Sequence, residues 1–185
     1  METKIANPAP LGLLGFAMTT ILLNIHNMGF FPLASVILGM GIFYGGLAQI
    51  IAGILCFKKG NVFAATAFTS YGFFWLSLVA MWMLPGTGIE AAAATPPAFV
   101  GWYLALWGIF TAFMWWGTWG NSKVQQFVFL SLTILFFLLA ISSWMGSEDL
   151  HKIAGLVGVI CGSSAFYLGV AELLEEVKHK KVLPY

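Results

Sequence analysis

Residues 7–30 read NPAPLGLLGFAMTTILLNIHNMGF, a helix-starting segment that leads directly into an apolar run without charges. Asn7 is a residue type that caps helices, and Pro8 suits the first helical turn, where its missing N–H group costs nothing. Gly12 removes a side chain one turn later, where another backbone or a solute could come close. We therefore expect a positioned helix N-terminus at a membrane boundary.

The composition of the chain indicates a membrane protein. Hydrophobic residues make up 60% of the sequence and charged residues 8%, and the mean hydropathy is +0.91. These proportions lie far outside those of soluble globular proteins. The segments that lack Lys, Arg, Asp and Glu are 5–57, 60–89, 91–122, 124–147 and 153–171. Each holds at least one run of about 20 residues, the length needed to cross the hydrocarbon core. The sequence predicts an all-α polytopic membrane protein.

Turn residues divide the chain into six predicted spans. Gly29 to Pro32 splits the first charge-free segment, and Pro85 to Gly88 and Thr95 to Pro97 bracket the longest loop. The predicted spans are about 9–30, 33–56, 61–84, 98–119, 123–145 and 152–174. Residues 1–185 form a single membrane domain in this interpretation. The first apolar run is too long for a cleavable signal peptide, so we expect it to be retained.

The placement of lysines predicts the orientation in the membrane. With six spans, both termini lie on one side. That side holds most of the lysines, namely Lys4, Lys58, Lys59, Lys123, Lys178, Lys180 and Lys181. The opposite loops hold Lys152 together with Glu90, Glu148 and Asp149. The positive-inside rule therefore predicts cytoplasmic termini in a plasma or inner membrane. Glu172, Glu175 and Glu176 dilute the positive charge of the C-terminal tail, and nothing in the charge pattern indicates nucleic-acid binding.

Glycines at four-residue spacing predict close helix contacts. Gly41 and Gly45 lie in the second span, and Gly158 and Gly162 lie in the sixth. Small residues at this spacing let helix backbones approach each other in lipid. Two interpretations remain open: packing between helices of one chain, and packing between copies of the chain.

Polar residues recur on single helical faces of several spans. Phe16, Thr20, Asn24 and Asn27 follow one another at intervals of three or four residues, which places them in one stripe along the first helix. Further candidates to line a pathway lie in the second and third spans: Tyr44, Gln49, Thr66 and Ser70. Hydroxyl and amide groups also join helices to each other, so the stripes fit either a polar pathway or helix packing.

The absence of some residue types excludes whole classes of chemistry. No Lys, Arg, Asp or Glu lies deep in any span, and His26 is the other ionisable candidate apart from Tyr and Cys. His26 has no acidic partner in its span, so the sequence offers no nucleophile–base pair for catalysis. It fits an interfacial or packed residue, with a proton-linked role as the alternative. Cys56 and Cys161 have no metal-ligand spacing and are expected to be buried thiols. We expect neither an enzyme nor a metal or other cofactor.

A path lined by amides, hydroxyls and aromatic rings suits a small solute that is neutral or weakly anionic. Without a fixed cation, an anion must be held by N–H and O–H donors and helix N-termini. A channel for neutral solutes such as urea, ammonia or glycerol is one alternative, and a scaffolding membrane protein is another. Asn7-Pro8-Ala9 also spells the aquaporin tripeptide, but a second copy is missing from the sequence.

Several segments resemble one family of transporters. They are residues 7–13 with Gly15 and Phe16, and residues 18–24, 41–46, 69–75, 126–129 and 161–165. Together they are similar to the acetate uptake transporter family, which includes bacterial acetate–succinate permeases and fungal acetate/ammonia-export proteins. The heptapeptide NPAPLGL is the specific part, and the resemblance covers nearly the whole chain except residues 85–98.

The resemblance implies a function and a set of site residues. It implies a homohexamer of six-helix protomers, each with its own path for acetate, other short monocarboxylates and, in bacteria, succinate. The constriction falls on Phe16, Tyr71 and Leu132, with Leu130 close to the last of these. Tyr71 would offer its hydroxyl group to the carboxylate, and Ala165 matches a small position near the path.

The resemblance leaves the transport mechanism open between a channel and a proton symporter. The missing intramembrane carboxylate favours a channel-like path. A titrating His26, or acetate that carries its own proton, would give symport instead. Asn7 either contacts the solute or only fixes where the first helix begins.

Overall fold

The computed structural model describes residues 6–89 and 92–185, and every regular element within these ranges is helical. Six helices in this part of the chain are long and apolar enough to cross a membrane, which confirms the predicted all-α, six-span fold. Lys4 and Glu90, which entered the charge argument for orientation, lie outside the described residues.

The first two spans are α1 (Ala9–Asn27) and a continuous helix made of α2 (Ser35–Met40), the π-helical η1 (Gly41–Ala48) and α3 (Gln49–Lys58). The other four are α4 (Val62–Met83), α5 (Pro97–Gly117), α6 (Lys123–Met145) and α7 (Glu148–Lys178). The short 3₁₀ element η2 (Leu84–Thr87) extends α4.

The ends of α1 and α7 differ most from the sequence-based expectation. The first helix ends at Asn27 and not near residue 30, since the chain turns at Gly29 with φ of 87°. The last helix runs for 31 residues and begins at Glu148, four residues before the expected span. Ser147 caps that helix by accepting a hydrogen bond from the Leu150 N–H. Charged residues end the apolar part of a span, but they do not end its helix.

Polar residues cap three further spans, as their positions before apolar runs require. Asn61 and Ser122 accept hydrogen bonds from backbone N–H groups at the starts of α4 and α6, at 3.0 Å each. At α1, Asn7 Oδ1 accepts a hydrogen bond of 3.2 Å from the Ala9 N–H, and Pro8 immediately precedes the helix. The asparagine therefore performs the capping role expected from the sequence, and the proline precedes the first turn instead of lying in it.

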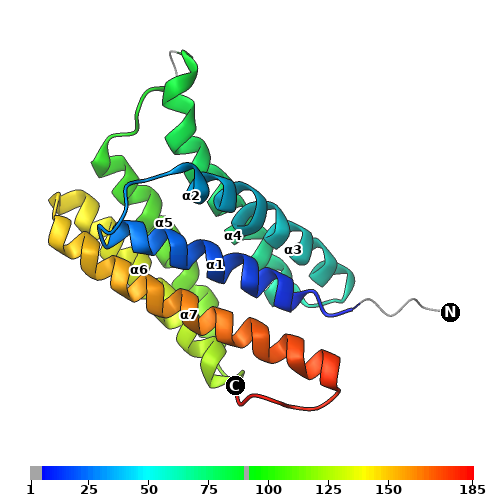
Figure 1. Cartoon of the computed structure of the whole chain (residues 1–185). Helices are drawn as coiled ribbons and strands as arrows, with labels where there is room; N and C mark the ends of the chain where they lie inside the picture. Colours follow the sequence, from blue (N-terminus) through cyan, green and yellow to red (C-terminus); the bar gives the residue numbers. More distant parts are fainter. Residues whose placement is uncertain (1–5, 90–91) are drawn as a thin grey trace.

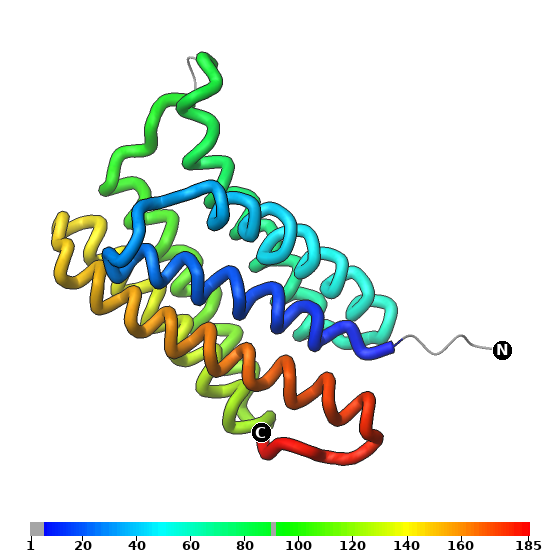
Figure 2. Tube along the Cα trace, viewed as in Figure 1, coloured from blue at the N-terminus to red at the C-terminus, as the bar shows by residue number. Residues whose placement is uncertain are grey.

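The helices form a bundle in which α1 runs between α7 and the α2–η1–α3 helix (Figures 1 and 2). α7 also packs on α6, α6 on α5, and α3 on α4. α4 and α5 are joined chiefly through side chains, including a hydrogen bond between Tyr71 and Thr111 and an edge-to-face contact between Phe74 and Trp107. The start of α1 and the end of α7 lie at the same end of the bundle, which we call the terminal end.

Glycines of α7 and η1 make close contacts within the protomer. Gly158 lies directly against the side chain of Asn24 on α1, so a Cβ atom there would overlap that amide. Gly45 lies in the same way against Thr19 of α1 and Trp75 of α4. Both glycine pairs thus have partners inside one chain, as in the first of the two interpretations.

An aromatic core fills the bundle, while one face of α5 is left uncovered. The core joins α1, α4, α5 and α6 through rings such as Phe74, Trp75 and Phe136. Cys56 and Cys161 are buried free thiols, as predicted. The uncovered face of α5 carries Trp102, Leu106, Ile109, Phe113 and Trp116. In a helix that crosses a membrane, such a face contacts lipid or another protein.

Candidate functional site

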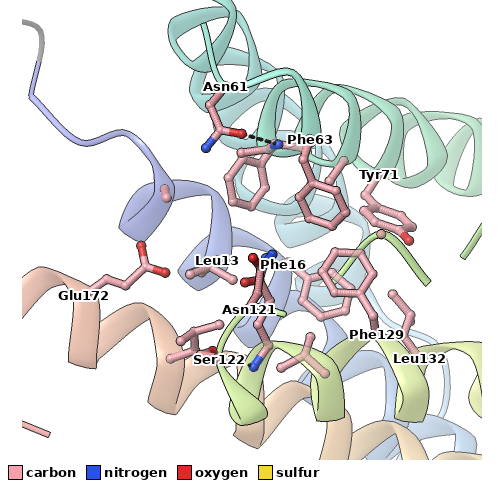
Figure 3. Close-up of a pocket in the computed structure, with 18 of the residues that line it drawn as sticks. Leu13, Phe16, Asn61, Phe63, Tyr71, Asn121, Ser122, Phe129, Leu132 and Glu172 are labelled. Carbon is pink, nitrogen blue, oxygen red and sulfur yellow. Dashed lines mark hydrogen bonds between the residues drawn. The ribbon is translucent and has the colours of Figure 1, made fainter. Parts of the chain in front are cut away.

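A cavity of about 600 Å³ enters the bundle at the terminal end. Ten of the residues that line it are labelled in Figure 3, and helices α1, α4, α6 and α7 supply nearly all of its wall. The lining residues are Ala9, Leu13, Phe16, Gln49, Asn61, Phe63, Ala64, Ala67, Phe68, Tyr71, Gly117, Asn121, Ser122, Gln125, Val128, Phe129, Leu132, Leu168, Glu172 and Tyr185. The mouth is rich in polar groups, and the inner part is apolar.

The inner end of the cavity brings together the three residues expected to form a constriction. Phe16, Tyr71 and Leu132 all line it and are 7%, 4% and 3% exposed. The rings of Phe16 and Tyr71 lie with their centroids 6.1 Å apart. Leu130, the other leucine considered, is not among the lining residues. These three side chains come from three helices. They form the apolar inner end of a cavity whose mouth is polar.

The hydroxyl group of Tyr71 is engaged within the protein. It donates a hydrogen bond of 3.0 Å to Thr111 Oγ1, and Thr111 in turn donates one of 2.7 Å to the carbonyl oxygen of Trp107. The predicted contact between this hydroxyl group and a carboxylate would require the hydroxyl group to leave Thr111 first.

The mouth of the cavity carries neutral polar side chains that the sequence analysis did not select. Asn61, Asn121, Ser122 and Gln125 come from the starts of α4 and α6 and the turn before α6. Asn61 and Ser122 cap helices. Their position directly before an apolar run is the feature of the sequence that could have identified them. They place amide and hydroxyl donors where a solute would enter.

Gln49 is a predicted pathway residue that does line the cavity. It is fully buried, and its Nε2 group donates a hydrogen bond of 2.7 Å to the carbonyl oxygen of Gly45. Its Oε1 atom has no hydrogen-bond partner among the described residues. A buried carbonyl oxygen without a donor is unfavourable.

Glu172 of α7 also lines the mouth and is half-buried. The side chain of Asn7, from the opening heptapeptide, lies beside its carboxyl group. The sequence analysis treated Glu172 only as part of the tail's charge balance. Its contact with the cavity depends on the packing of α7 along α1, which no local pattern specifies.

Other residues expected along the path do not line this cavity, namely Asn7, Thr20, Asn24, Tyr44, Thr66, Ser70 and Ala165. Asn24 donates a hydrogen bond of 2.8 Å to the carbonyl oxygen of Thr20 and accepts one of 3.0 Å from Asn27. The amides of the stripe on α1 therefore bind the helix and each other, in the contact between α1 and α7. His26 lies at the opposite end of the bundle, where its Nδ1 atom is 2.7 Å from the carbonyl oxygen of Phe31.

A second cavity, of about 450 Å³, lies toward the opposite end between α4, η2 and α5. Ser77 and Tyr103 line it, and their hydroxyl oxygens are 2.7 Å apart. Rings of Phe74, Tyr103 and Trp107 fill the space from this cavity to Tyr71. The two cavities are thus separated by packed aromatic side chains, with Tyr71 on the inner side.

A six-helix membrane bundle with cavities at both ends and an aromatic closure between them is the architecture of a channel or transporter. Among the described residues, no three His, Cys, Asp or Glu side chains gather closely enough to hold a metal ion. The model of the GPR1/FUN34/yaaH family matches residues 1–184, and the chain belongs to that family. This confirms the resemblance drawn from the motifs.

Individual relatives are named as transporters. The chain is 57% identical over 183 residues to the succinate-acetate/proton symporter SatP of Escherichia coli K12, covering 99% of this chain and 96% of that protein. It is 32% identical over 197 residues to acetate permease A of Emericella nidulans (98% and 66%). It is 37% identical over 170 residues to ammonia transport outward protein 2 of Saccharomyces cerevisiae (89% and 60%).

A solved structure of the bacterial acetate channel SatP matches the fold with a TM-score of 0.95. It is 57% identical, and the match covers 98% of this chain and 99% of that one.

Proposed function

We propose that this protein conducts acetate and related short carboxylates, including succinate, across the membrane. The observation that carries the proposal is the cavity that narrows from amide and hydroxyl groups to Phe16, Tyr71 and Leu132. Polar donors at the mouth replace part of the water around a carboxylate, and the apolar closure admits only a small dehydrated group such as a methyl. Similarity to SatP over almost the whole chain supports the same substrates.

The lining of the cavity favours weak binding and fast passage. Among the described residues that line it there is no Lys, Arg or His. An anion is therefore held only by neutral donors, and conduction requires binding that is weak enough for release. The constriction residues Phe16, Tyr71 and Leu132 control passage in this mechanism, and the protein forms no covalent intermediate.

Two mechanisms differ in what crosses the constriction. In a channel, the carboxylate crosses as an anion. In proton symport by the neutral acid, the proton crosses on the carboxyl group of the solute itself and no side chain has to carry it. The relatives are named in both ways, as a proton symporter and as a channel.

The second candidate function is passage of a small neutral solute such as urea or ammonia. The neutral amide and hydroxyl groups that line the mouth favour it, since such groups bind neutral solutes as well as anions. The 37% identity to a fungal protein named for ammonia transport also points in this direction.

Transport assays in proteoliposomes test these alternatives. Radiolabelled acetate, succinate and urea are supplied in turn at pH 8, where unassisted diffusion of acetic acid is slow, with protein-free liposomes as the control. Carboxylate uptake above the control supports the main proposal, and uptake of urea alone supports the second. Two further measurements separate the mechanisms. Uptake of the anion should require compensating charge, which potassium and valinomycin supply. Uptake of the neutral acid should acidify the lumen, which an internal pH dye reports.

The proposed setting is a plasma or inner membrane with both termini in the cytoplasm. Lysines at the terminal end support this orientation, namely Lys58, Lys59, Lys123, Lys178, Lys180 and Lys181. The uncovered face of α5, from Trp102 to Trp116, supports contact between protomers of a homohexamer, each with its own path. Native mass spectrometry of the detergent-solubilised protein tests the number of subunits.

A further inference from the structure

Glu172 is the only carboxylic acid among the described residues that line the cavity at the terminal end. Figure 3 shows it projecting from α7 on one side of the cavity, with Tyr71 and Leu132 on the other. Its side chain is half-buried, so water screens it less than it screens an exposed glutamate. A solute that passes between the constriction and the terminal side travels close to this carboxyl group.

The groups around Glu172 do not surround it with positive charge. Asn7, which precedes α1, lies beside it, and Asn61 and Gln125 line the same mouth from the start of α4 and from α6. All three side chains are neutral. Two further carboxyl groups of α7, Glu175 and Glu176, lie close enough to act on it. The nearest lysines described are Lys59, which acts on Cys56, and Lys181, which lies over the ring of Tyr185. Neither lysine is among the residues that line the cavity.

The neighbouring glutamate of α7 is held by a different partner. The Tyr185 hydroxyl group donates a hydrogen bond of 2.5 Å to Glu175 Oε2. This bond, together with burial, raises the pKa of Tyr185 to about 12, so the phenol is neutral at physiological pH and remains a donor. Tyr185 thus engages Glu175, which is not among the lining residues, and leaves Glu172 as the carboxyl group that faces the cavity.

We propose that Glu172 is a specificity-determining residue, whose negative charge at the mouth of the path slows carboxylates in proportion to their own charge. The inference rests on the proposed function. Coulomb repulsion is proportional to the charge of the solute, so the dianion succinate meets twice the barrier that acetate meets. Because the rate depends exponentially on the barrier, the factor by which Glu172 slows succinate is the square of the factor by which it slows acetate. Glu172 in this way favours monocarboxylates in a path that also admits succinate.

The experiment compares acetate and succinate flux at pH 7.5 in proteoliposomes that contain the wild-type chain or the Glu172→Gln variant. Glutamine keeps the size of the side chain and removes its charge. We expect acetate flux to rise by about threefold and succinate flux by about tenfold, the square of the smaller factor. Raising the ionic strength from about 0.01 M to 1 M, which shortens the Debye length from about 30 Å to 3 Å, should reduce this difference in the wild type and leave the variant unaffected.

Glu176→Gln is the matched control, because Glu176 lies one turn further along α7, is exposed and does not line the cavity. It removes the same net charge and should leave the succinate-to-acetate ratio unchanged. Glu172→Asp keeps the charge and should keep the wild-type ratio. Melting temperatures in detergent show whether each variant is folded.

The two proposals fail in different ways. Absence of any carboxylate flux through the folded wild-type protein would overturn the proposed function. Normal wild-type flux with the same succinate-to-acetate ratio in Glu172→Gln would overturn the role of Glu172 alone. An equal rise of the ratio in Glu176→Gln would also overturn it, because the effect would then come from net charge and not from the mouth of the path.

Discussion

The hydroxyl group of Tyr71 donates a hydrogen bond of 3.0 Å to Thr111 Oγ1, joining α4 to α5 at the inner end of the cavity. Both side chains are buried, and the Thr111 hydroxyl group donates a hydrogen bond of 2.7 Å to the carbonyl oxygen of Trp107. These two hydrogen bonds hold the ring of Tyr71 in its place next to the rings of Phe16 and Phe129. A polar contact to α5 therefore holds Tyr71, one of the three residues of the proposed constriction, in place.

The variant Tyr71→Phe removes the hydroxyl group and keeps the ring, so it tests the role of the hydroxyl group alone. Because the hydroxyl is engaged by Thr111, we expect the variant to conduct acetate within about twofold of the wild type while losing about 1 kcal/mol of stability, the usual net value of a buried hydrogen bond. Acetate flux in proteoliposomes and the melting temperature in detergent measure the two effects. Loss of flux at an unchanged melting temperature would mean that the hydroxyl contacts the solute.

The variant Phe16→Ala should widen the constriction. Removal of the ring that faces Tyr71 lowers the steric barrier for bulkier monocarboxylates. We expect the ratio of lactate flux to acetate flux to rise by about tenfold, which corresponds to a barrier lower by about 1.4 kcal/mol. Leu132→Ala should act in the same direction. Phe43→Ala is the control, because Phe43 is 68% exposed on the outer face of η1. An unchanged ratio in both Phe16→Ala and Leu132→Ala would remove these residues from the constriction.

The variant Gly158→Ala should loosen the contact between α1 and α7. Its methyl group would overlap the side chain of Asn24, and overpacking of this kind costs about 1–3 kcal/mol. We expect a lower melting temperature. Gly39→Ala is matched to it, since Gly39 is also helical but has open space where a Cβ would lie. That control should leave stability unchanged or raise it by less than about 1 kcal/mol. Equal melting temperatures for the two variants would contradict the described packing.

The variant His26→Ala should retain acetate transport. His26 lies outside both cavities, and its ring nitrogen is bonded to the Phe31 carbonyl group at the end of the bundle away from Glu172. We expect acetate uptake driven by a pH gradient to stay within about twofold of the wild type, since a side chain outside the path carries no step of conduction. A folded variant without uptake would assign proton coupling to this histidine.

Much of the fold could be predicted from residue types and their spacing. Charge-free segments of about 20 residues specify six spans, because a charged side chain is costly in hydrocarbon. Glycines at intervals of four mark where helices meet, and a capping residue before an apolar run marks where a helix begins. The exceptions are the ends of α1 and α7, where turn geometry and a serine cap set the boundary and hydropathy does not.

The structure brings together some of the residues expected to form the site and separates others. Phe16, Tyr71 and Leu132 were placed by resemblance to a family, and the structure gathers them at one end of a cavity. The polar stripe on α1 gave the opposite result: Asn24 packs against Gly158 and binds Thr20, so an amide that looked suited to a path joins two helices. Periodicity identifies which face of a helix is polar, but it does not show whether a neighbouring helix or a solute contacts that face.

The sequence by itself determined that the chain crosses the membrane six times, where the apolar spans lie and which family it belongs to. These properties depend on residues near one another along the chain, through local transfer energies and local motifs. Only the tertiary structure decided that Asn7 lies beside Glu172 and that Tyr71 is bonded to Thr111. Such contacts join residues up to 165 positions apart along the sequence, and only the packing of whole helices brings them together.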